Sequence, residues 1–311
     1  MDVRDRYPLA EQVGVEGYYI RINPSGVPTC DLKGQFLKIN NLPDDKAEVL
    51  VTELVSVDAL ALVRFGLRAA DDPRILNTIK VIDAVLKVDT PTGPCWYRYN
   101  HDGYGEHEDG SPFDGTGIGR AWPLLTGERA HYEIAAGNLK GARKLLETME
   151  SFANHGLFPE QIWDADDLPE RELFFGKFSG SAMPLVWAHA EYIKLCCSIK
   201  EKKVFDLPQP VYARYVENKQ ESAQVAWRFT QPITTLPVGR GLRIETRAAA
   251  MIHWTADNWE TSKKISTRDT GLGIYFADLP VRKKKSGRIE FTFYWEEAEC
   301  WEGKDFTVEI V

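Results

Sequence analysis

The spacing of apolar residues changes its period along the chain. Before about residue 204 they recur every three or four positions, which predicts helices, and from about Ala223 they alternate with polar residues, which predicts strands. Pro208 and Pro210 interrupt both patterns and indicate a linker. We therefore expect a multidomain α and β protein, with helical hairpins over 1–203, a linker over 204–222 and a β-sandwich module over 223–311.

The first part predicts five helices. One follows Ser56, over 57–70, and the next takes Asp72 as its N-cap and Pro73 as its first helical residue. The other three are expected over 117–137, 139–154 and 183–200. Apolar stripes that would face a core are clearest in the second and fourth helices, where they comprise Ile75, Ile79, Ile82 and Leu86, and Leu145, Met149 and Phe152.

Two long loops, 89–114 and 155–180, separate the predicted helices. Loops of this length inside a compact domain are usually functional, and both are rich in acidic and aromatic residues. Helical hairpins that present such loops suit an α-barrel with its site at one mouth.

The strands of the second part are expected in the runs "VAWRFT", "GLRIETRAAAMIHW", "GIYFADL", "RIEFTFYW" and "DFTVEIV". Trp254, Trp259, Trp295 and Trp301 lie in or between these runs. Aromatic rings stack on the C–H faces of sugars, so the four form either a sugar platform or ordinary core and interface packing. Exposure of two or more of them on one face would favour sugar binding.

Composition and charge narrow the class of ligand. The net charge of −8 argues against a nucleic-acid partner, since phosphates are neutralised by a basic surface. Nine tryptophans among 311 residues favour an uncharged, ring-bearing substrate such as a sugar. No apolar run is long enough for a membrane span, and the first residues do not form a signal peptide. The location stays open: cytoplasmic, or secreted if the natural N-terminus is missing.

Neither a metal nor an organic cofactor is expected. His101 and His107 lack companion histidines at ligand spacing. The five cysteines are irregularly spaced and form no CxxC motif, so they suggest neither a zinc site nor a disulfide framework. Two of them, Cys196 and Cys197, are expected as buried thiols of the last helix.

The first loop carries "RYNHDGYGEHEDGSPFDGTGIGRAW", in which Arg98 is followed by Asp102 and Tyr104. An arginine fork and nearby carboxylates can hold several sugar hydroxyls, because each hydroxyl both donates and accepts. The glycines would let the backbone approach a ligand closely. The alternative is a loop braced by its own Arg–Asp pairs.

The second loop carries "GLFPEQIWDADD", with Glu160 directly after Pro159. A carboxylate here can act as a base, with Trp163 as a ring wall beside it. The three aspartates that follow, Asp164, Asp166 and Asp167, are expected as solvated or capping residues.

These segments, with "DALALVRFGLRAADDPRILNTIKVIDAVLK" and "SAMPLVWAHAEYIKL", resemble the second half of the catalytic domain of glycoside hydrolase family 15, in its bacterial glucoamylase and glucodextranase branch. The resemblance covers about residues 1–200. The β-rich part resembles the module that often follows this domain in bacterial members.

The resemblance implies part of an (α/α)6 barrel and an exo-acting α-glucosidase that cleaves α-1,4 bonds of α-glucans or maltooligosaccharides with inversion. Glu160 would be the general base, using water as second substrate. Arg98 and Tyr104, with Asp102 in the same segment, would bind glucose, and Trp122 would be a stacking platform. Inverting hydrolases place two carboxylates roughly 6.5–9.5 Å apart.

The family's general acid lies upstream of every motif found here. We therefore expect this chain to lack the N-terminal half of its enzyme, to be inactive alone, and to leave the two apolar stripes named above partly open. Glu106 or Glu108 as a substitute acid has no support from the family. The alternatives are a glucodextranase, which cleaves α-1,6 bonds, and a non-catalytic carbohydrate-binding protein.

Overall fold

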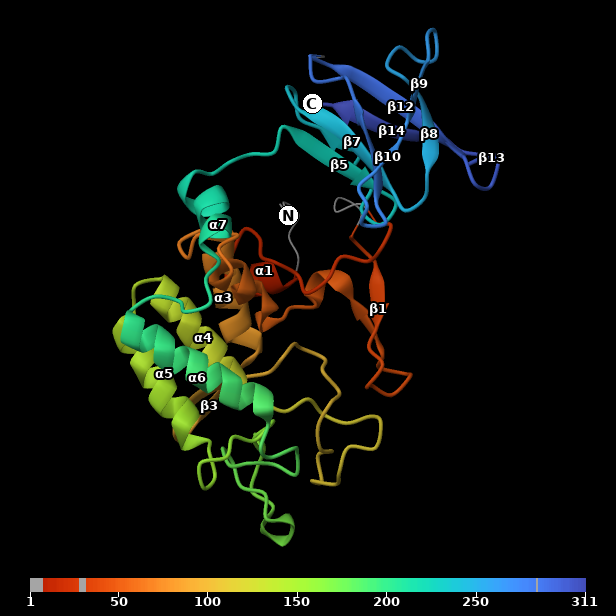
Figure 1. Cartoon of the computed structure of the whole chain (residues 1–311). Helices are drawn as coiled ribbons and strands as arrows, with labels where there is room; N and C mark the ends of the chain where they lie inside the picture. Colours follow the sequence, from red (N-terminus) through yellow and green to blue (C-terminus); the bar gives the residue numbers. More distant parts are fainter. Residues whose placement is uncertain (1–7, 28–31, 284) are drawn as a thin grey trace. The chain divides into compact units, whose positions relative to one another are not determined.

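The computed structural model describes residues 8–27, 32–283 and 285–311 (Figure 1). The chain divides into two compact units. The helical unit comprises Met1–Ile22 and Lys33–Gln220, and the β unit comprises Asn23–Leu32 and Glu221–Val311. Most of the segment expected as a linker thus belongs to the helical unit, where α7 (Gln209–Tyr212) continues into a π-helical turn (Ala213–Glu217).

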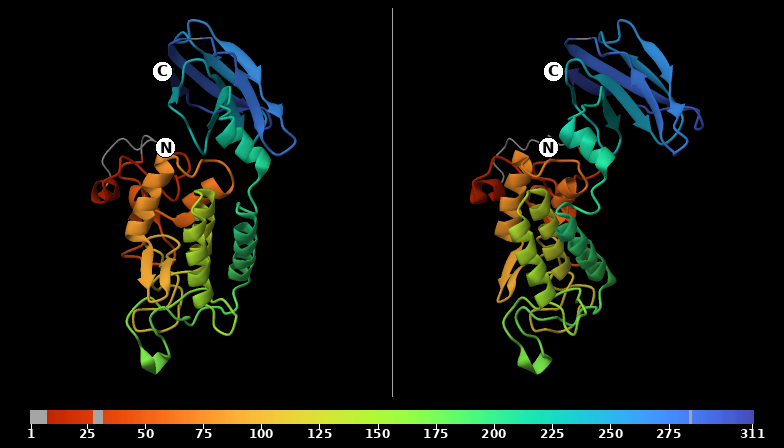
Figure 2. Two further views of the ribbon diagram at one scale, coloured as in Figure 1. Left: turned by 90° about the vertical axis from the view of Figure 1, so that its left-hand side faces the viewer. Right: turned by 60° about the vertical axis from the view of Figure 1, so that its left-hand side comes forward.

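Three helices form the main layer of the helical unit: α4 (Pro123–Ala135), α5 (Leu139–Ser151) and α6 (Val186–Glu201). They lie side by side, with α4 in contact with both others (Figure 2). The helix expected over 117–137 starts only at Pro123, because the residues before it bridge to other segments, Trp122 to Trp96 and Ala121 to Ile162.

A fourth long helix, α3 (Pro73–Val85), begins as the sequence predicts. The Asp72 side chain accepts a hydrogen bond from the Arg74 amide at 2.9 Å, and so caps the first turn. The helix expected over 57–70 is shorter, a 3-10 turn (Val57–Leu60) followed by α2 (Ala61–Arg64). The short α1 (Pro8–Val13) packs against α3.

Two small antiparallel hairpins complete this unit. The first hairpin pairs β1 (Phe36–Lys38) with β2 (Glu48–Leu50). A 3-10 turn (Val51–Glu53) follows β2 directly. The other pairs β3 (Lys87–Thr90) with β4 (Gly93–Trp96), so the loop expected to start at residue 89 is ordered as a hairpin up to Trp96.

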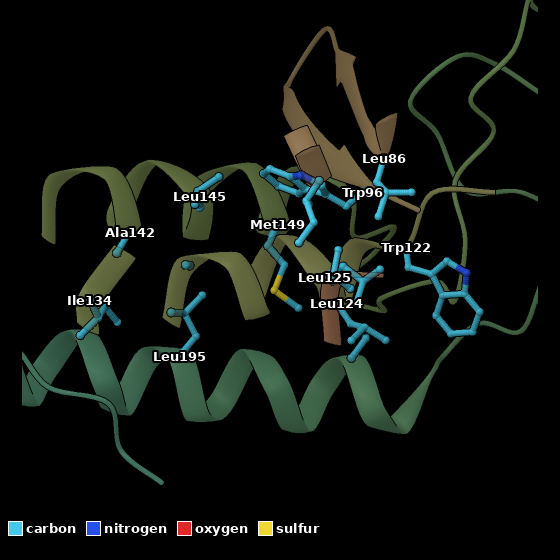
Figure 3. Close-up of a cluster of buried hydrophobic side chains, with 14 of the residues drawn as sticks. Leu86, Trp96, Trp122, Leu124, Leu125, Ile134, Ala142, Leu145, Met149 and Leu195 are labelled. Atoms are coloured by element: carbon cyan, nitrogen blue, oxygen red, sulfur yellow. The ribbon is translucent and has the colours of Figure 1, made fainter. Parts of the chain in front are cut away.

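The core of the helical unit lies between its long helices (Figure 3). The apolar stripes named in the sequence lie on α3 and α5, and just past their C-terminal ends. We expected them to stay partly open, and this expectation is wrong, because all their residues are buried in the core clusters of the helical unit. The most exposed large apolar side chains of the long helices lie on α6, where Val186, Trp187 and Ile193 are 79%, 54% and 61% exposed. None of the helices in the described ranges is long and apolar enough to cross a membrane.

The β unit is a sandwich of two sheets. The first has the order β10-β11-β7-β5, and the second has the order β6-β14-β12-β8-β9 with β13 paired to β12. The first comprises β5 (Gln224–Arg228), β7 (Gly241–Thr246), β10 (Arg268–Asp269) and β11 (Tyr275–Leu279). The second comprises β6 (Thr235–Leu236), β8 (Ala250–Thr255), β9 (Lys263–Ser266), β12 (Gly287–Trp295), β13 (Cys300–Trp301) and β14 (Phe306–Ile310).

Alternate residues of both sheets build the core between them. Along β12, Ile289, Phe291 and Phe293 are fully buried, and the Trp227 ring of β5 packs edge-on against Phe291 at 5.1 Å. Most strand pairs are antiparallel, but β5 pairs with β7 and β14 with β6 in parallel.

A fragment of residues 221–311 is expected to fold alone and to melt in one cooperative transition. Every residue of its core cluster lies between Val225 and Ile310, so the fragment contains its whole core. Near-ultraviolet circular dichroism during heating would measure this. A gradual loss of signal without a transition would contradict the prediction.

Candidate active site

The two long loops meet because of how the helices are connected. The first loop leads into the start of α4, and the second joins the end of α5 to the start of α6, so both lie at the same end of the helix layer (Figure 1). A bridge of Ile162 to Ala121 links the second loop to the segment between the first loop and α4, and a bridge of Ile162 to Phe178 closes the second loop on itself. Between them is a hollow of about 380 Å³, lined among others by Tyr104, Glu106, Phe113, Glu160, Gln161 and Arg171.

Glu160 lies partly buried in this hollow. Its amide donates to the Ala182 carbonyl at 2.8 Å, which fixes the backbone, and the Tyr104 hydroxyl donates to its Oε2 at 3.4 Å. Burial raises the pKa of the Glu160 carboxyl, and the negative charge of Glu106 adds to this rise. The Tyr104 hydrogen bond and the positive charge of Arg98 act in the opposite direction. The result is a carboxylate that is more basic than a solvated one.

Arg98, Asp102 and Tyr104 come together as one group. The guanidinium of Arg98 donates two hydrogen bonds to Asp102, at 2.7 and 2.9 Å, and the Tyr104 amide donates a third to the same carboxylate at 3.0 Å. The Asp102 side chain is only 2% exposed, whereas that of Arg98 is 31% exposed. The Asp102 carboxylate is therefore not accessible to a substrate in this structure. Its three hydrogen bonds instead hold the Arg98 side chain and the Tyr104 backbone in place.

Trp122, expected as a stacking platform, is 3% exposed. The Arg98 guanidinium lies 4.7 Å from its ring centroid, and the Tyr104 ring lies 6.3 Å away. Its ring has no open face for a sugar because it packs in the core and under Arg98. The structure places Trp122 as support for Arg98 through a cation–π contact.

Trp163, expected as a ring wall, does not reach the hollow either, since it is fully buried. Its indole N–H donates to the Asp166 carbonyl at 2.7 Å, and the Arg120 guanidinium lies 4.1 Å from the ring. Asp164, expected as solvated or capping, is instead a buried ion-pair partner of Arg120 at 2.8 Å. The exposed aspartates of this run are Asp166 and Asp167.

Arg120 is a key residue that the sequence did not single out. Besides Asp164, it donates to the carbonyls of Glu106 and His107 at 2.8 and 2.9 Å. Asp164 also accepts from the Ala121 amide at 2.8 Å. One buried arginine thus ties the loop of Tyr104 to the loop of Glu160. The available signal was an arginine directly before "AW" and an acidic run after "IW", but sequence alone does not pair them.

Glu106 is the second carboxylate that lines the hollow. It is 6% exposed, and its Oε2 has no hydrogen-bond partner among the described residues. An unpaired buried carboxylate oxygen is costly, and a bound hydroxyl would supply the missing donor. No pattern in the sequence distinguished Glu106 from its acidic neighbours Glu108 and Asp109.

The glycines of the first loop serve backbone packing rather than ligand approach. A Cβ on Gly103 would lie 1.9 Å from the Asn41 carbonyl oxygen, and one on Gly117 would lie 2.0 Å from that of Gly105. At Gly103 this loop thus passes the β1–β2 connection, and at Gly117 the chain passes its own loop, at distances that only glycine permits.

Within the described ranges, no cluster of three or more histidine, cysteine, aspartate or glutamate side chains could hold a metal ion. His107 instead contacts Asp114 at 3.2 Å. Cys95 is a buried free thiol, whereas Cys196 and Cys197, expected as buried, are half-exposed, and Cys30 lies outside the described residues.

Comparison with known proteins identifies the helical unit. A glucoamylase of Clostridium sp. (strain G0005) is 48% identical over 200 residues, which are 64% of this chain and 26% of that protein. A bacterial glucoamylase, crystallised in complex with acarbose, is also 48% identical, with a TM-score of 0.55 over 64% of this chain and 27% of its own. The chain thus spans about a quarter of the length of either glucoamylase. The sequence profile of the Glycosyl hydrolases family 15 matches residues 13–196, and the chain belongs to this family.

Proposed function

We propose that this chain supplies part of the active site of a glucoamylase-type hydrolase, which releases glucose from the non-reducing ends of α-1,4-glucans with inversion. The observation that carries the proposal is the position of Glu160, partly buried in the hollow and in contact with Tyr104 beside the Arg98–Asp102 pair. The family and the 48% identical glucoamylases support the same reaction class. In this proposal the helical unit is part of an (α/α)6 barrel.

Glu160 acts as the general base. Its raised pKa lets it take a proton from a water molecule while that water attacks the anomeric carbon. Arg98 and Tyr104 bind the hydroxyls of the glucose at the cleavage site, and Asp102 holds the guanidinium in place through two hydrogen bonds. Gln161, whose amide donates to the Tyr104 carbonyl at 2.7 Å, fixes the loop that carries the tyrosine.

The reaction also needs a general acid, across the bond from Glu160 and roughly 6.5–9.5 Å from it. The family resemblance assigns this acid to an earlier barrel loop than any in this chain. Glu106 remains next to the base, where it raises the pKa of Glu160 and can accept a substrate hydroxyl.

A hybrid enzyme tests the proposal. Its design places the matching segment of this chain in the Clostridium glucoamylase, so that the rest of the barrel comes from the relative. The hybrid should release β-glucose from maltose, seen by proton NMR of the fresh product, and should cleave maltose faster than isomaltose. Faster cleavage of isomaltose would instead assign a glucodextranase, and a folded hybrid without glucose release would reject the proposal.

Tyr104→Phe in the same hybrid should move the acidic limb of the kcat/KM profile to higher pH. The lost hydrogen bond favours the ionised form of Glu160, so its removal raises the pKa of that carboxyl further. A base must be ionised to work, and activity is therefore lost at a higher pH as the medium is acidified. Tyr192→Phe is the matched control, because it removes a tyrosine–carboxylate hydrogen bond, to Glu150 at 2.8 Å, outside the hollow. An acidic limb that stays in place or moves downward would contradict the contact.

A further inference from the structure

The hollow between the two long loops extends beyond the group proposed to bind glucose. Tyr104 and Glu160 line it, whereas Arg98 is not among its lining residues. A glucose ring held by the Arg98 guanidinium therefore lies beside the hollow and does not fill it. The volume of the hollow, about 380 Å³, is that of a small-molecule site. It has room for a second ring of the same substrate.

Glu106 is buried in the wall of this hollow with an oxygen left over. The residue is 6% exposed, and its Oε2 has no hydrogen-bond partner in the part of the chain that the structure describes. Its Oε1 lies against the second loop, because a Cβ on Gly180 would be 3.1 Å from it. The charge of Glu106 also opposes ionisation of Glu160. An unpaired oxygen and a like charge both cost stability in the free protein, which points to a donor supplied by a ligand.

The main chain, and not the carboxylate, holds Glu106 at this place. Arg120 donates to the Glu106 carbonyl at 2.8 Å, and the same arginine pairs with Asp164 of the second loop. Replacing the Glu106 side chain leaves both contacts intact. The position of the carboxylate is therefore fixed by the loops, while its Oε2 remains available to a ligand.

Other groups that line the hollow suit a sugar ring. Phe113 is partly buried and meets the Tyr104 ring edge-on, with centroids 5.0 Å apart. The side chain of Arg171 is 40% exposed and lies 3.6 Å from the Asp109 carboxylate, which is too long for a hydrogen bond, so its guanidinium has donors left for a ligand. A pyranose offers apolar C–H faces to rings and hydroxyls to donors and acceptors.

We propose that Glu106 is a specificity-determining residue, which accepts a hydroxyl of a second sugar ring in the hollow. This ring belongs to the same glucan as the glucose that Arg98 and Tyr104 bind. The choice of a glucan rests on the proposed function, whereas the unpaired carboxylate oxygen does not. A site with a buried acceptor discriminates strongly against ligands that lack the matching hydroxyl, because the acceptor is then left unpaired.

The test compares a one-ring and a two-ring ligand on the full chain, by saturation-transfer NMR titration. Methyl α-glucoside offers only the ring for Arg98, and maltose adds the ring for the hollow. Glu106→Ala should weaken maltose binding by about tenfold or more, as for a lost hydrogen bond to a charged group, and leave methyl α-glucoside binding unchanged. Glu106→Gln should lie between, because the amide keeps an acceptor oxygen but not the charge. Glu108→Gln, on the exposed neighbour, should bind both ligands as the parent does.

Thermal melting distinguishes this role from a structural one. Glu106→Gln should melt at or above the temperature of the parent, because it removes a buried charge and keeps the shape of the side chain. A clear fall in that melting temperature would overturn the proposal. An equal loss of both ligands in Glu106→Ala would do the same, as would a parent chain that binds maltose no more tightly than methyl α-glucoside.

The hybrid enzyme gives a second readout that a structural role would not move. Glu106→Gln should shift the acidic limb of its kcat/KM profile to lower pH, opposite to Tyr104→Phe, because the charge that raises the pKa of Glu160 is gone. A limb that moves upward would contradict the placement of both carboxylates at one hollow. Ligand binding to the full chain needs no turnover, so a folded hybrid without glucose release would reject the proposed function alone.

Discussion

Glu160→Gln should reduce kcat on maltose by about 100- to 10,000-fold in the hybrid enzyme, the contribution typical of a positioned general base. The amide has nearly the shape of the carboxylate and keeps the backbone bond to Ala182, but it cannot take a proton from water. KM should change little, because Arg98 and Tyr104 still bind the sugar. Initial rates of glucose release over a range of maltose concentrations measure both constants.

The matched control is Asp166→Asn, which makes the same chemical change on an exposed residue of the same loop. It should leave kcat within about twofold of the parent, as surface changes away from a site usually do. A Glu160→Gln hybrid with near-parental kcat would remove Glu160 from the role of base.

Arg120→Met should lower the free energy of unfolding of this chain by about 3–5 kcal/mol, the cost of leaving one partner of a buried ion pair alone. Both side chains of the Arg120–Asp164 pair are 3% exposed, and the change also removes donors to the carbonyls of Glu106 and His107. Urea denaturation, followed by circular dichroism, measures the difference.

Lys38→Met is the control, since it breaks the Lys38–Asp44 pair on the open surface and should leave the unfolding midpoint unchanged. Arg120→Lys should fall between the two, because lysine restores the charge but not the planar fork that reaches both Asp164 and the carbonyls. Equal midpoints for Arg120→Met and the parent would show that this arginine does not hold the loops together.

The sequence indicated the Asp72 cap, and it left open whether Arg98 and Asp102 bind a sugar or brace their own loop, as they do in the structure. The Asp72 cap lies two residues from its partner, and Arg98, Asp102 and Tyr104 lie within seven residues of each other. The motif around Glu160 also indicated which acid to examine, and the structure places it beside Tyr104, 56 residues away in the sequence. The cap was predictable because its two residues are neighbours in the sequence, and Glu160 was indicated because its motif resembles that of a known family.

The tryptophans show that spacing in the sequence does not predict which aromatic rings are exposed. Trp122 and Trp163 have the same side chain as the exposed Trp187 and Trp301, yet they lie in the core. Whether a ring is open depends on which distant segments pack over it, such as Arg98 over Trp122 and Arg120 over Trp163. The expectation of open stripes on the second and fourth helices was wrong for the same reason, since α4 and its neighbours cover them.

The sequence by itself thus determined the change from a mainly helical to a β-rich part, the helix cap and the family, and it indicated Glu160, Arg98 and Tyr104 as candidate site residues. Periodicity, capping and motifs carry this information because they are properties of neighbouring residues. Tertiary structure decided the rest. It paired Arg120 with Asp164 across 44 residues, and it left one carboxylate oxygen of Glu106 at the hollow without a hydrogen-bond partner among the described residues. Each of these depends on long-range packing, which sets burial and hydrogen-bond partners only once the chain has folded.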